Sequence, residues 1–357
     1  MSKFYNNRTK ELTPYVPGEQ PKDKNYLKLN TNESPYPPSP AALEAINLVT
    51  NADLRLYPDP DCMQLKGAIC EAYGVLVENI FVGNGSDEVL AIAFQTFFEA
   101  EKTVLFPALT YSFYPVYAQL YGLNYETIQL DENFNIPVEK FFSSKGGVII
   151  PNPNAPTSVA LPLSKIEKII SNNADVVVII DEAYVDFGSE SAVGLTVKYP
   201  NLLVVQTLSK SRGLAGLRVG YAIGSSELIS GLEKVKNSFN SYTLDRIALA
   251  GAVASIKDIE YNRKIQKKII ATRDWSATRF AQLGFKMTDA KANFLFVSPP
   301  DGNAPKMLNE LRDRGILVRY FSKTPKWLRI TVGTDEQMLT LLSVVEQLIK
   351  KGMSNDD

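Results

Sequence analysis

The run at residues 176–180, Val-Val-Val-Ile-Ile, constrains the fold more than any other feature of this sequence, and Asp181 follows it directly. The run is β-branched throughout and has no polar alternation. Such a segment suits a strand that is buried on both faces of a mainly parallel sheet. It therefore predicts an α/β fold.

Further short apolar runs alternate with helical patterns between about residues 80 and 235. This order of strand, turn, helix and strand predicts an α/β sandwich with right-handed crossovers. After about residue 235 the pattern changes: a long helical stretch comes first, and strand-like and amphipathic segments follow it. This pattern indicates a smaller α+β domain. The expected strands are 80–82, 103–106, 148–150, 202–205, 219–223, 294–297, 316–319 and 328–331, and the later helical segments are 241–283, 304–314 and 335–350.

We therefore expect three parts. Residues 1–40 are rich in Pro, Asn and Tyr and predict an irregular N-terminal arm that packs with the small domain. Residues 41–235 form the large domain, and residues 236–357 form the small C-terminal domain. Ser39 followed by Pro40 predicts a helix start, because serine caps helices and proline fits their first position.

The 357 residues include no histidine. This excludes histidine-based catalysis and histidine-ligated metal sites, and two cysteines cannot form a four-thiolate zinc site, so we expect no metal. The 38 basic and 39 acidic residues indicate no nucleic-acid partner. We expect no membrane span, no signal peptide and a cytoplasmic location, since the chain has no long apolar stretch and no apolar segment near Met1.

Polar loops follow four of the expected strands. Asp181 ends one strand, and Lys210 follows another with small residues around it. Each feature alone has an ordinary explanation: Asp181 could cap a helix, and most lysines are solvated. Ligands of open α/β sheets bind where the carboxyl ends of strands meet, so four such loops together favour a binding site. The other two loops are 83–88, which could bind phosphate at a helix start, and 151–157.

These loops belong to a set of motifs that resembles the fold-type I pyridoxal-phosphate aminotransferases, specifically the histidinol-phosphate aminotransferase branch. The motifs run in family order over nearly the whole chain. The resemblance implies an aspartate aminotransferase-like fold, with pyridoxal 5′-phosphate held by the large domain. The matching stretches are 29–35, 56–60, 83–88, 181–187, 207–210, 213–220 and 328–334.

The resemblance assigns the chemistry to three residues. Lys210 would form a Schiff base with the cofactor and then carry the proton. Asp181 would pair with the pyridinium nitrogen, and Tyr184 would hydrogen-bond the ring hydroxyl. Tyr111 would stack on the ring, and the phosphate would be held by Ser86, Asp87, Ser209 and Arg218, with Tyr57 reaching it from a second subunit of a homodimer whose active site is shared.

The substrate residues follow from the same resemblance. Arg329 would clamp the substrate α-carboxylate, and Arg319 with Tyr15 would hold a substrate phosphate. Asn240 or Tyr242 would line the same pocket. The expected partners are small molecules, an amino acid or phosphorylated amino alcohol and a 2-oxo acid.

Two positions depart from the family pattern. The asparagine that donates to the cofactor ring hydroxyl is replaced by Ala155, and the motif's glycine is replaced by Ser158. Either Asn154 takes over the donor role or Tyr184 acts alone. Without a compensating donor, the cofactor's imine pKa should rise slightly.

The sequence therefore predicts a transaminase that converts histidinol phosphate and 2-oxoglutarate to imidazole acetol phosphate and glutamate, in histidine biosynthesis. Alternatives are an aromatic or broad-range aminotransferase, a threonine-phosphate decarboxylase-like enzyme, and a protein that uses the glycine turns for other phosphates.

Overall fold

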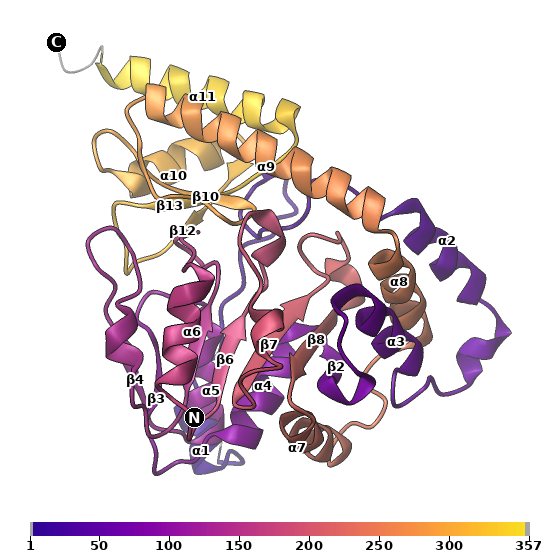
Figure 1. Cartoon of the computed structure of the whole chain (residues 1–357). Helices are drawn as coiled ribbons and strands as arrows, with labels where there is room; N and C mark the ends of the chain where they lie inside the picture. Colours follow the sequence, from indigo (N-terminus) through magenta and orange to yellow (C-terminus); the bar gives the residue numbers. More distant parts are fainter. Residues whose placement is uncertain (1–2, 354–357) are drawn as a thin grey trace.

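The computed structural model describes residues 3–353, and its largest element is a sheet of seven strands (Figure 1). Neighbouring strands in the run from β7 to β4 are parallel, whereas β8 is antiparallel to both of its neighbours. The mainly parallel α/β sheet expected from the sequence is therefore confirmed. In spatial order the strands are β2 (Ile80–Asn84), β8 (Val219–Gly224), β7 (Leu202–Thr207), β6 (Val178–Asp181), β5 (Val148–Pro151), β3 (Val104–Pro107) and β4 (Tyr125–Ile128).

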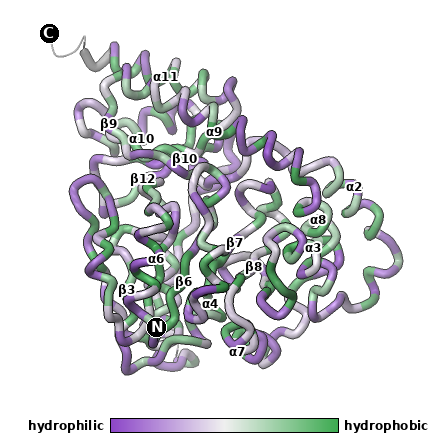
Figure 2. Tube along the Cα trace, in the orientation of Figure 1, coloured by the Kyte–Doolittle hydropathy of each residue, from purple (hydrophilic) through white to green (hydrophobic). Residues whose placement is uncertain are grey.

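Both faces of this sheet are buried. Val178 and Ile180 of β6 pack into one apolar cluster, and Ile179 packs into a second cluster on the opposite face. Figure 2 shows the central strands as mostly hydrophobic and α7 as largely hydrophilic. The covering helices are α3 (Met63–Tyr73), α4 (Gly85–Phe97), α5 (Phe113–Tyr121), α6 (Leu163–Ser171), α7 (Ser226–Asn237) and α8 (Arg246–Lys257).

Strand β6 begins two residues later than the sequence predicts, and Asp181 is its last residue. The backbone N–H of Val176 instead closes a turn onto the carbonyl of Asn173, so the ladder starts at Val178. Asp181 does not cap an α-helix, because the element that follows is the short 3-10 helix η4 (Val185–Phe187).

A second, antiparallel sheet lies between the long C-terminal helices and the large sheet (Figure 1). Its strands in spatial order are β12 (Arg319–Tyr320), β13 (Leu328–Thr331), β10 (Phe294–Ser298) and β9 (Lys286–Met287). The expected strand at 316–319 is split, because β11 (Ile316–Leu317) pairs with β1 (Leu27–Lys28) and only β12 joins the sheet. The helices here are α9 (Ile259–Gln282), α10 (Ala304–Asp313) and α11 (Asp335–Met353).

The helical stretch expected at 241–283 is two helices. Asp245 caps α8, and Asp258 ends α8 and caps α9 by accepting the N–H of Tyr261. An aspartate at a cap competes with helix continuation through its side chain, which explains the break.

The N-terminal segment contacts a helix that covers the large sheet and a strand from the C-terminal part of the chain. Helix α1 (Asn7–Glu11) lies against α5, where Gln119 donates to the carbonyl of Glu11 at 2.6 Å, and β1 pairs with β11. Helix α2 (Pro40–Val49) begins after Ser39, which caps it as expected. The expected domain limits at residues 1 and 357 lie outside the described residues. The remaining 3-10 helices are η1 (Ala52–Arg55), η2 (Val77–Asn79), η3 (Val138–Phe141), η5 (Ala192–Leu195) and η6 (Ala215–Leu217).

Within residues 3–353, none of the helices combines the length and apolar character that crossing a bilayer requires.

Candidate active site

A polar cavity of about 90 Å³ opens at the carboxyl ends of β5, β6 and β7. Right-handed crossovers bring the loops after these parallel strands to one edge of the sheet, which is why residues distant in sequence meet there. Most of the predicted cofactor residues line it: Ser86, Asp87, Tyr111, Asp181, Tyr184, Ser209, Lys210 and Arg218.

Asp181 is the most deeply placed ionisable group of the cavity, with 5% of its surface exposed. Its Oδ2 accepts a hydrogen bond from the phenol of Tyr114 at 2.7 Å, and its Oδ1 accepts the backbone N–H of Ala183 at 3.2 Å. Burial raises the pKa of Asp181 to about 6, although the bond from Tyr114 opposes that rise. A buried carboxylate of this kind is stabilised by a cationic group that enters the cavity.

Lys210 lies in the loop that follows β7. The loop is closed by two backbone bonds, from Leu208 to the carbonyl of Val219 and from Leu214 to that of Leu208. The Nζ of Lys210 lies 5.7 Å from the centre of the Tyr184 ring, inside the cavity lining. The amine is thus directed into the cavity that Asp181 borders.

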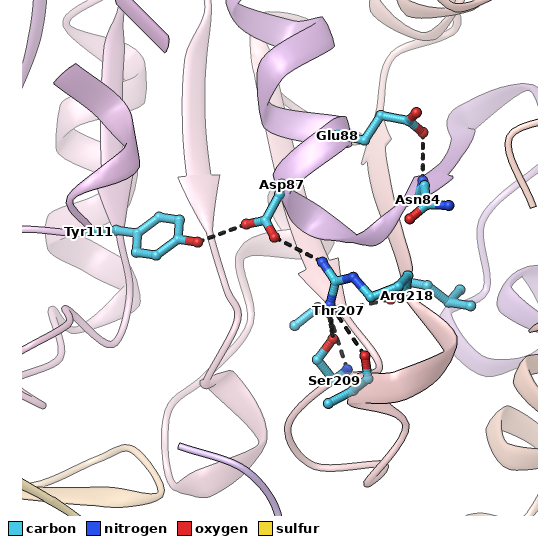
Figure 3. Close-up of polar contacts among 9 residues, drawn as sticks. Asn84, Asp87, Glu88, Tyr111, Thr207, Ser209 and Arg218 are labelled. Atoms are coloured by element: carbon cyan, nitrogen blue, oxygen red, sulfur yellow. Dashed lines mark hydrogen bonds and ion pairs between the residues drawn. The ribbon is translucent and has the colours of Figure 1, made fainter. Parts of the chain in front are cut away.

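The opposite end of the cavity is a cluster of donors around the start of α4 (Figure 3). Arg218 is ion-paired to Oδ2 of Asp87 at 2.8 Å and donates to the hydroxyl of Ser209 at 3.4 Å. A Cβ on Gly220 would lie 2.3 Å from the backbone nitrogen of Ser86, so only glycine lets β8 approach this helix start. Free N–H groups at a helix start, a guanidinium and a hydroxyl suit a phosphate.

Tyr111 connects this cluster to the rest of the cavity. Its hydroxyl donates to Oδ1 of Asp87 at 2.7 Å, as Figure 3 shows, and its ring meets that of Tyr114 edge-on at 5.8 Å. Burial raises the pKa of Tyr111, so the phenol stays protonated. Tyr111 therefore lines the same cavity as Asp181 and Arg218.

The structure does not bring Asn154 to the cavity. Its amide nitrogen donates to the carbonyl of Leu109 at 3.0 Å and to the hydroxyl of Thr157 at 2.9 Å, while Ala155 lines the cavity. Ser158 has a φ of 64°, the left-handed region that favours glycine. Its hydroxyl accepts the backbone N–H groups of residues 291 and 292, at 3.1 and 2.9 Å, which holds that conformation in place.

A second cavity of about 170 Å³ adjoins the first and shares Tyr111, Ala155, Tyr184 and Lys210 with it. Tyr15, Arg319 and Arg329, the residues that the resemblance assigns to the substrate, line it.

Arg319 and Arg329 face each other directly as cross-strand partners in the β12–β13 pair. The Arg329 guanidinium donates to the carbonyl of Asn30 at 2.9 Å, and burial together with Arg319 lowers its pKa. Within residues 3–353 neither arginine has an ion-pair partner within 4 Å. Like charges directly opposite each other destabilise a sheet unless an anion lies between them.

Three further predicted residues lie outside both cavities. Tyr57 is 76% exposed and stacks on Tyr242 at 4.6 Å between ring centres. Neither these tyrosines nor Asn240 lines the cavities of this chain.

The sequence reasoning missed two residues. Tyr114, which holds Asp181, sits three residues after Tyr111 on a helix, but no local pattern indicates its partner. Asn32 lies within the 29–35 motif, and the sequence alone indicates no role for it. Its side chain donates to the hydroxyl of Tyr184 at 3.0 Å.

Pyridoxal phosphate fits these residues in three respects. The buried carboxylate of Asp181 lines the cavity, Lys210 lines it as well, and the donors around Arg218 suit a phosphate.

Comparisons with known proteins place the chain in a family. The model of the class I and II aminotransferases matches residues 24–345. The chain is 57% identical over 351 residues to a histidinol-phosphate aminotransferase of Clostridium acetobutylicum, which covers 98% of this chain and 100% of that protein. It is 51% identical over 353 residues to one from Clostridium botulinum, with 98% and 100% covered.

Solved structures agree on the fold. The histidinol-phosphate aminotransferase of Sinorhizobium meliloti, in complex with pyridoxal-5′-phosphate, superposes with a TM-score of 0.89 at 23% identity and covers 98% of this chain and 99% of that one. The aspartate aminotransferase of Thermus thermophilus with maleate has a TM-score of 0.84 at 17% identity, with 97% and 100% covered.

The chain therefore belongs to the class I and II aminotransferase family. Within it, the resemblance to the histidinol-phosphate aminotransferase branch is confirmed by full-length relatives. The predicted fold and the predicted cofactor, pyridoxal 5′-phosphate, are confirmed with it.

Proposed function

We propose that this chain transfers the amino group of histidinol phosphate to 2-oxoglutarate, giving imidazole acetol phosphate and glutamate for histidine biosynthesis. The observation that carries the substrate class is the pair of facing arginines, Arg319 and Arg329, beside the cavity that Lys210 enters. Two guanidinium groups without acidic partners offer two anion sites, one for the phosphate of the amino donor and one for the carboxylate of glutamate, and a neutral aromatic side chain would not use the first.

Asp181 sets the charge of the site. When bound, the cofactor supplies an electron-withdrawing ring that makes the substrate's Cα–H acidic. The buried carboxylate of Asp181 holds a proton on the ring nitrogen, and Tyr114 and the N–H of Ala183 fix its orientation. Pairing with that cation reverses the rise in the pKa of Asp181 that burial causes.

Lys210 supplies the amine that anchors the cofactor and then moves the proton. A chain without histidine needs another base at this point, and the Nζ of Lys210 is the amine that lines both cavities. Its free amine would be the base that moves the Cα proton of the substrate.

The remaining residues bind and orient. Ser86, Ser209 and Arg218 would hold the cofactor phosphate, Tyr111 would pack on the ring, and Tyr184 would donate to the ring hydroxyl. Arg319 with Tyr15 binds the substrate phosphate, and Arg329 binds the α-carboxylate of glutamate.

We further propose a cytoplasmic homodimer with shared active sites. Tyr57 is exposed beside Leu56 and Tyr242, which are also exposed, and so is available to a second subunit. In that arrangement its hydroxyl reaches the partner's cofactor phosphate. The free thiols of Cys62 and Cys70 fit a reducing compartment.

A substrate panel tests the assignment. We expect the purified holoenzyme to have a far higher kcat/KM for histidinol phosphate than for phenylalanine or tyrosine, with 2-oxoglutarate as acceptor. Faster turnover of the aromatic amino acids would contradict the substrate. Release of carbon dioxide without a keto product would instead indicate a decarboxylase, and an as-purified protein without visible absorbance would contradict the cofactor chemistry.

A further inference from the structure

The hydroxyl of Tyr184 accepts a hydrogen bond from a residue that belongs to neither sheet. Asn32 lies between β1 and α2, is 1% exposed, and has a φ of 56°. Its amide nitrogen donates to the Tyr184 oxygen at 3.0 Å. Asparagine adopts this left-handed conformation more readily than most residues, which suits it to this position.

Neighbouring hydrogen bonds set the direction of the Asn32 amide. The backbone N–H of Asn32 donates to the hydroxyl of Thr331 at 2.9 Å, and that hydroxyl donates to the Asn32 Oδ1 at 3.1 Å. The side-chain amide nitrogen of Asn293 donates to the backbone carbonyl of Asn32 at 3.0 Å. Because the oxygen of the amide is used by Thr331, its nitrogen is turned toward Tyr184.

This arrangement decides which way the phenol of Tyr184 points its hydrogen. A phenol has one hydrogen and can also accept, and here Asn32 occupies the accepting side. The structure gives the Tyr184 hydrogen no acceptor within residues 3–353. The hydrogen is therefore available to an acceptor in the cavities that Tyr184 lines.

The ring of Tyr184 is held as well as its hydroxyl. It packs against Ala155 and meets Phe294 edge-on at 5.0 Å between ring centres. Ala155 stands where related enzymes carry a donor amide, so this side of the cavity offers no second donor from that position. The Tyr184 hydroxyl is therefore the donor that remains on this side.

We propose that Asn32 is a positioning residue that makes Tyr184 a hydrogen-bond donor to the cofactor's ring hydroxyl, which offsets the donor lost at Ala155. The proposal rests on the proposed function. A donor at that oxygen stabilises its anionic form and so lowers the pH at which the bound cofactor's visible absorption band changes. Asn32 lines the second cavity but not the first, and it acts on this pH through Tyr184.

The test measures that pH midpoint by absorbance in four holoenzymes: wild type, Asn32→Asp, Tyr184→Phe and the double variant. Aspartate has the same shape, but it accepts, so it draws the Tyr184 hydrogen away from the ring. We expect Asn32→Asp to raise the midpoint by about one pH unit, a tenfold change in proton affinity. When Asn32→Asp is made in the Tyr184→Phe background, we expect the midpoint to rise much less, because only the added negative charge then acts.

An equal rise in both backgrounds would overturn the proposal, because the effect would then be charge alone. Asn32→Ala repeats the comparison without a charge, and it keeps the test open if the aspartate variant does not fold. It should raise the midpoint when Tyr184 is present and leave it unchanged in the Tyr184→Phe background. A rise of equal size in both backgrounds would again contradict the proposal.

Asn173→Asp is the matched control. Asn173 is also buried, and its amide nitrogen donates to the backbone carbonyls of Phe141 and Ile169, but it lines neither cavity. Its midpoint should equal that of the wild type, and an equal shift there would show that the effect of Asn32→Asp is not specific. Failure of the proposed function is distinguishable, because it would appear in the wild-type protein as no visible band or no transamination.

Discussion

The phenol of Tyr114 donates a 2.7 Å hydrogen bond to Oδ2 of Asp181, and both side chains are buried, with Asp181 lining the first cavity. This bond favours the charged carboxylate against the effect of burial. It links α5 to β6 and holds the group that must stay ionised when the cofactor is bound.

Removing that hydroxyl should weaken the site. Hydrogen bonds to charged groups contribute about 1.5–3 kcal/mol, so Tyr114→Phe should weaken cofactor binding by about tenfold or more. It should also move the acid limb of the kcat/KM profile to higher pH, because Asp181 then protonates more readily. Spectroscopic titration of the cofactor-free protein with pyridoxal phosphate measures the first effect.

Tyr117 supplies the matched control on the same helix. Its buried hydroxyl has no hydrogen-bond partner in the described structure, so Tyr117→Phe removes the same atom without touching Asp181. Equal losses in both variants would contradict the role given to the Tyr114–Asp181 bond.

The stability of the cofactor-free protein should fall as Asp181 ionises. Its folded pKa of about 6 lies above the ordinary 3.8, so the folded state binds more protons between these values. This contribution is therefore present at low pH and lost as pH rises through about 6. Asp181→Asn removes it, so its free energy of unfolding relative to wild type should rise by about 1–2 kcal/mol from about pH 5 to about pH 8.

Urea unfolding of both cofactor-free proteins at the two pH values measures this difference. The advantage of the asparagine variant should disappear when pyridoxal phosphate is bound, because the ring nitrogen then pairs with the carboxylate. A difference that does not change with pH would show that Asp181 is charged in the folded, cofactor-free protein throughout.

Arg319 should matter only for a substrate that carries the phosphate. Arg319→Gln removes a charge-assisted contact, so the preference for histidinol phosphate over histidinol should shrink by about 10- to 100-fold in kcat/KM. Arg312→Gln is the control, since Arg312 pairs with Glu19 at 3.0 Å on the surface and lines neither cavity. An unchanged preference in Arg319→Gln would exclude Arg319 from the phosphate site.

Mixing two impaired proteins tests the shared active site. If Tyr57 reaches the partner's cofactor, a heterodimer of Lys210→Ala and Tyr57→Phe subunits has one site with both defects and one intact site. Activity should therefore recover after co-refolding to a level above either parent. No recovery in a confirmed heterodimer would place Tyr57 in its own subunit's site or outside the chemistry.

Most of the site could be predicted from the sequence because its residues end strands of a parallel sheet, and motif order places them at one edge. Asp181 ends β6 and Lys210 follows β7, so both are of this kind. Arg218 instead directly precedes β8, and it lines the same cavity because β8 runs antiparallel to β7. The strand patterns also predicted the large sheet, apart from β4, whose sequence Tyr-Glu-Thr-Ile carries too little apolar signal at the sheet's border.

What could not be predicted depends on contacts between distant segments. The donation from Tyr114 to Asp181 spans 67 positions, and that from Asn32 to Tyr184 spans 152. The sequence also leaves the orientation of Asn154 open. In the structure its amide nitrogen donates to the carbonyl of Leu109 and the hydroxyl of Thr157 and does not line the cavity. Pairings like these follow from the packed fold and leave no local pattern.

A single-turnover experiment tests the central claim most directly. Holoenzyme is mixed with histidinol phosphate in the absence of 2-oxoglutarate, and the visible band and the product are followed together. We predict that wild type loses the band and forms about one imidazole acetol phosphate per active site, because the ping-pong reaction stops after one half. Lys210→Ala, folded and loaded with cofactor, should form the product far more slowly. Product formation at the wild-type rate by Lys210→Ala, or none by the wild type, would contradict the account.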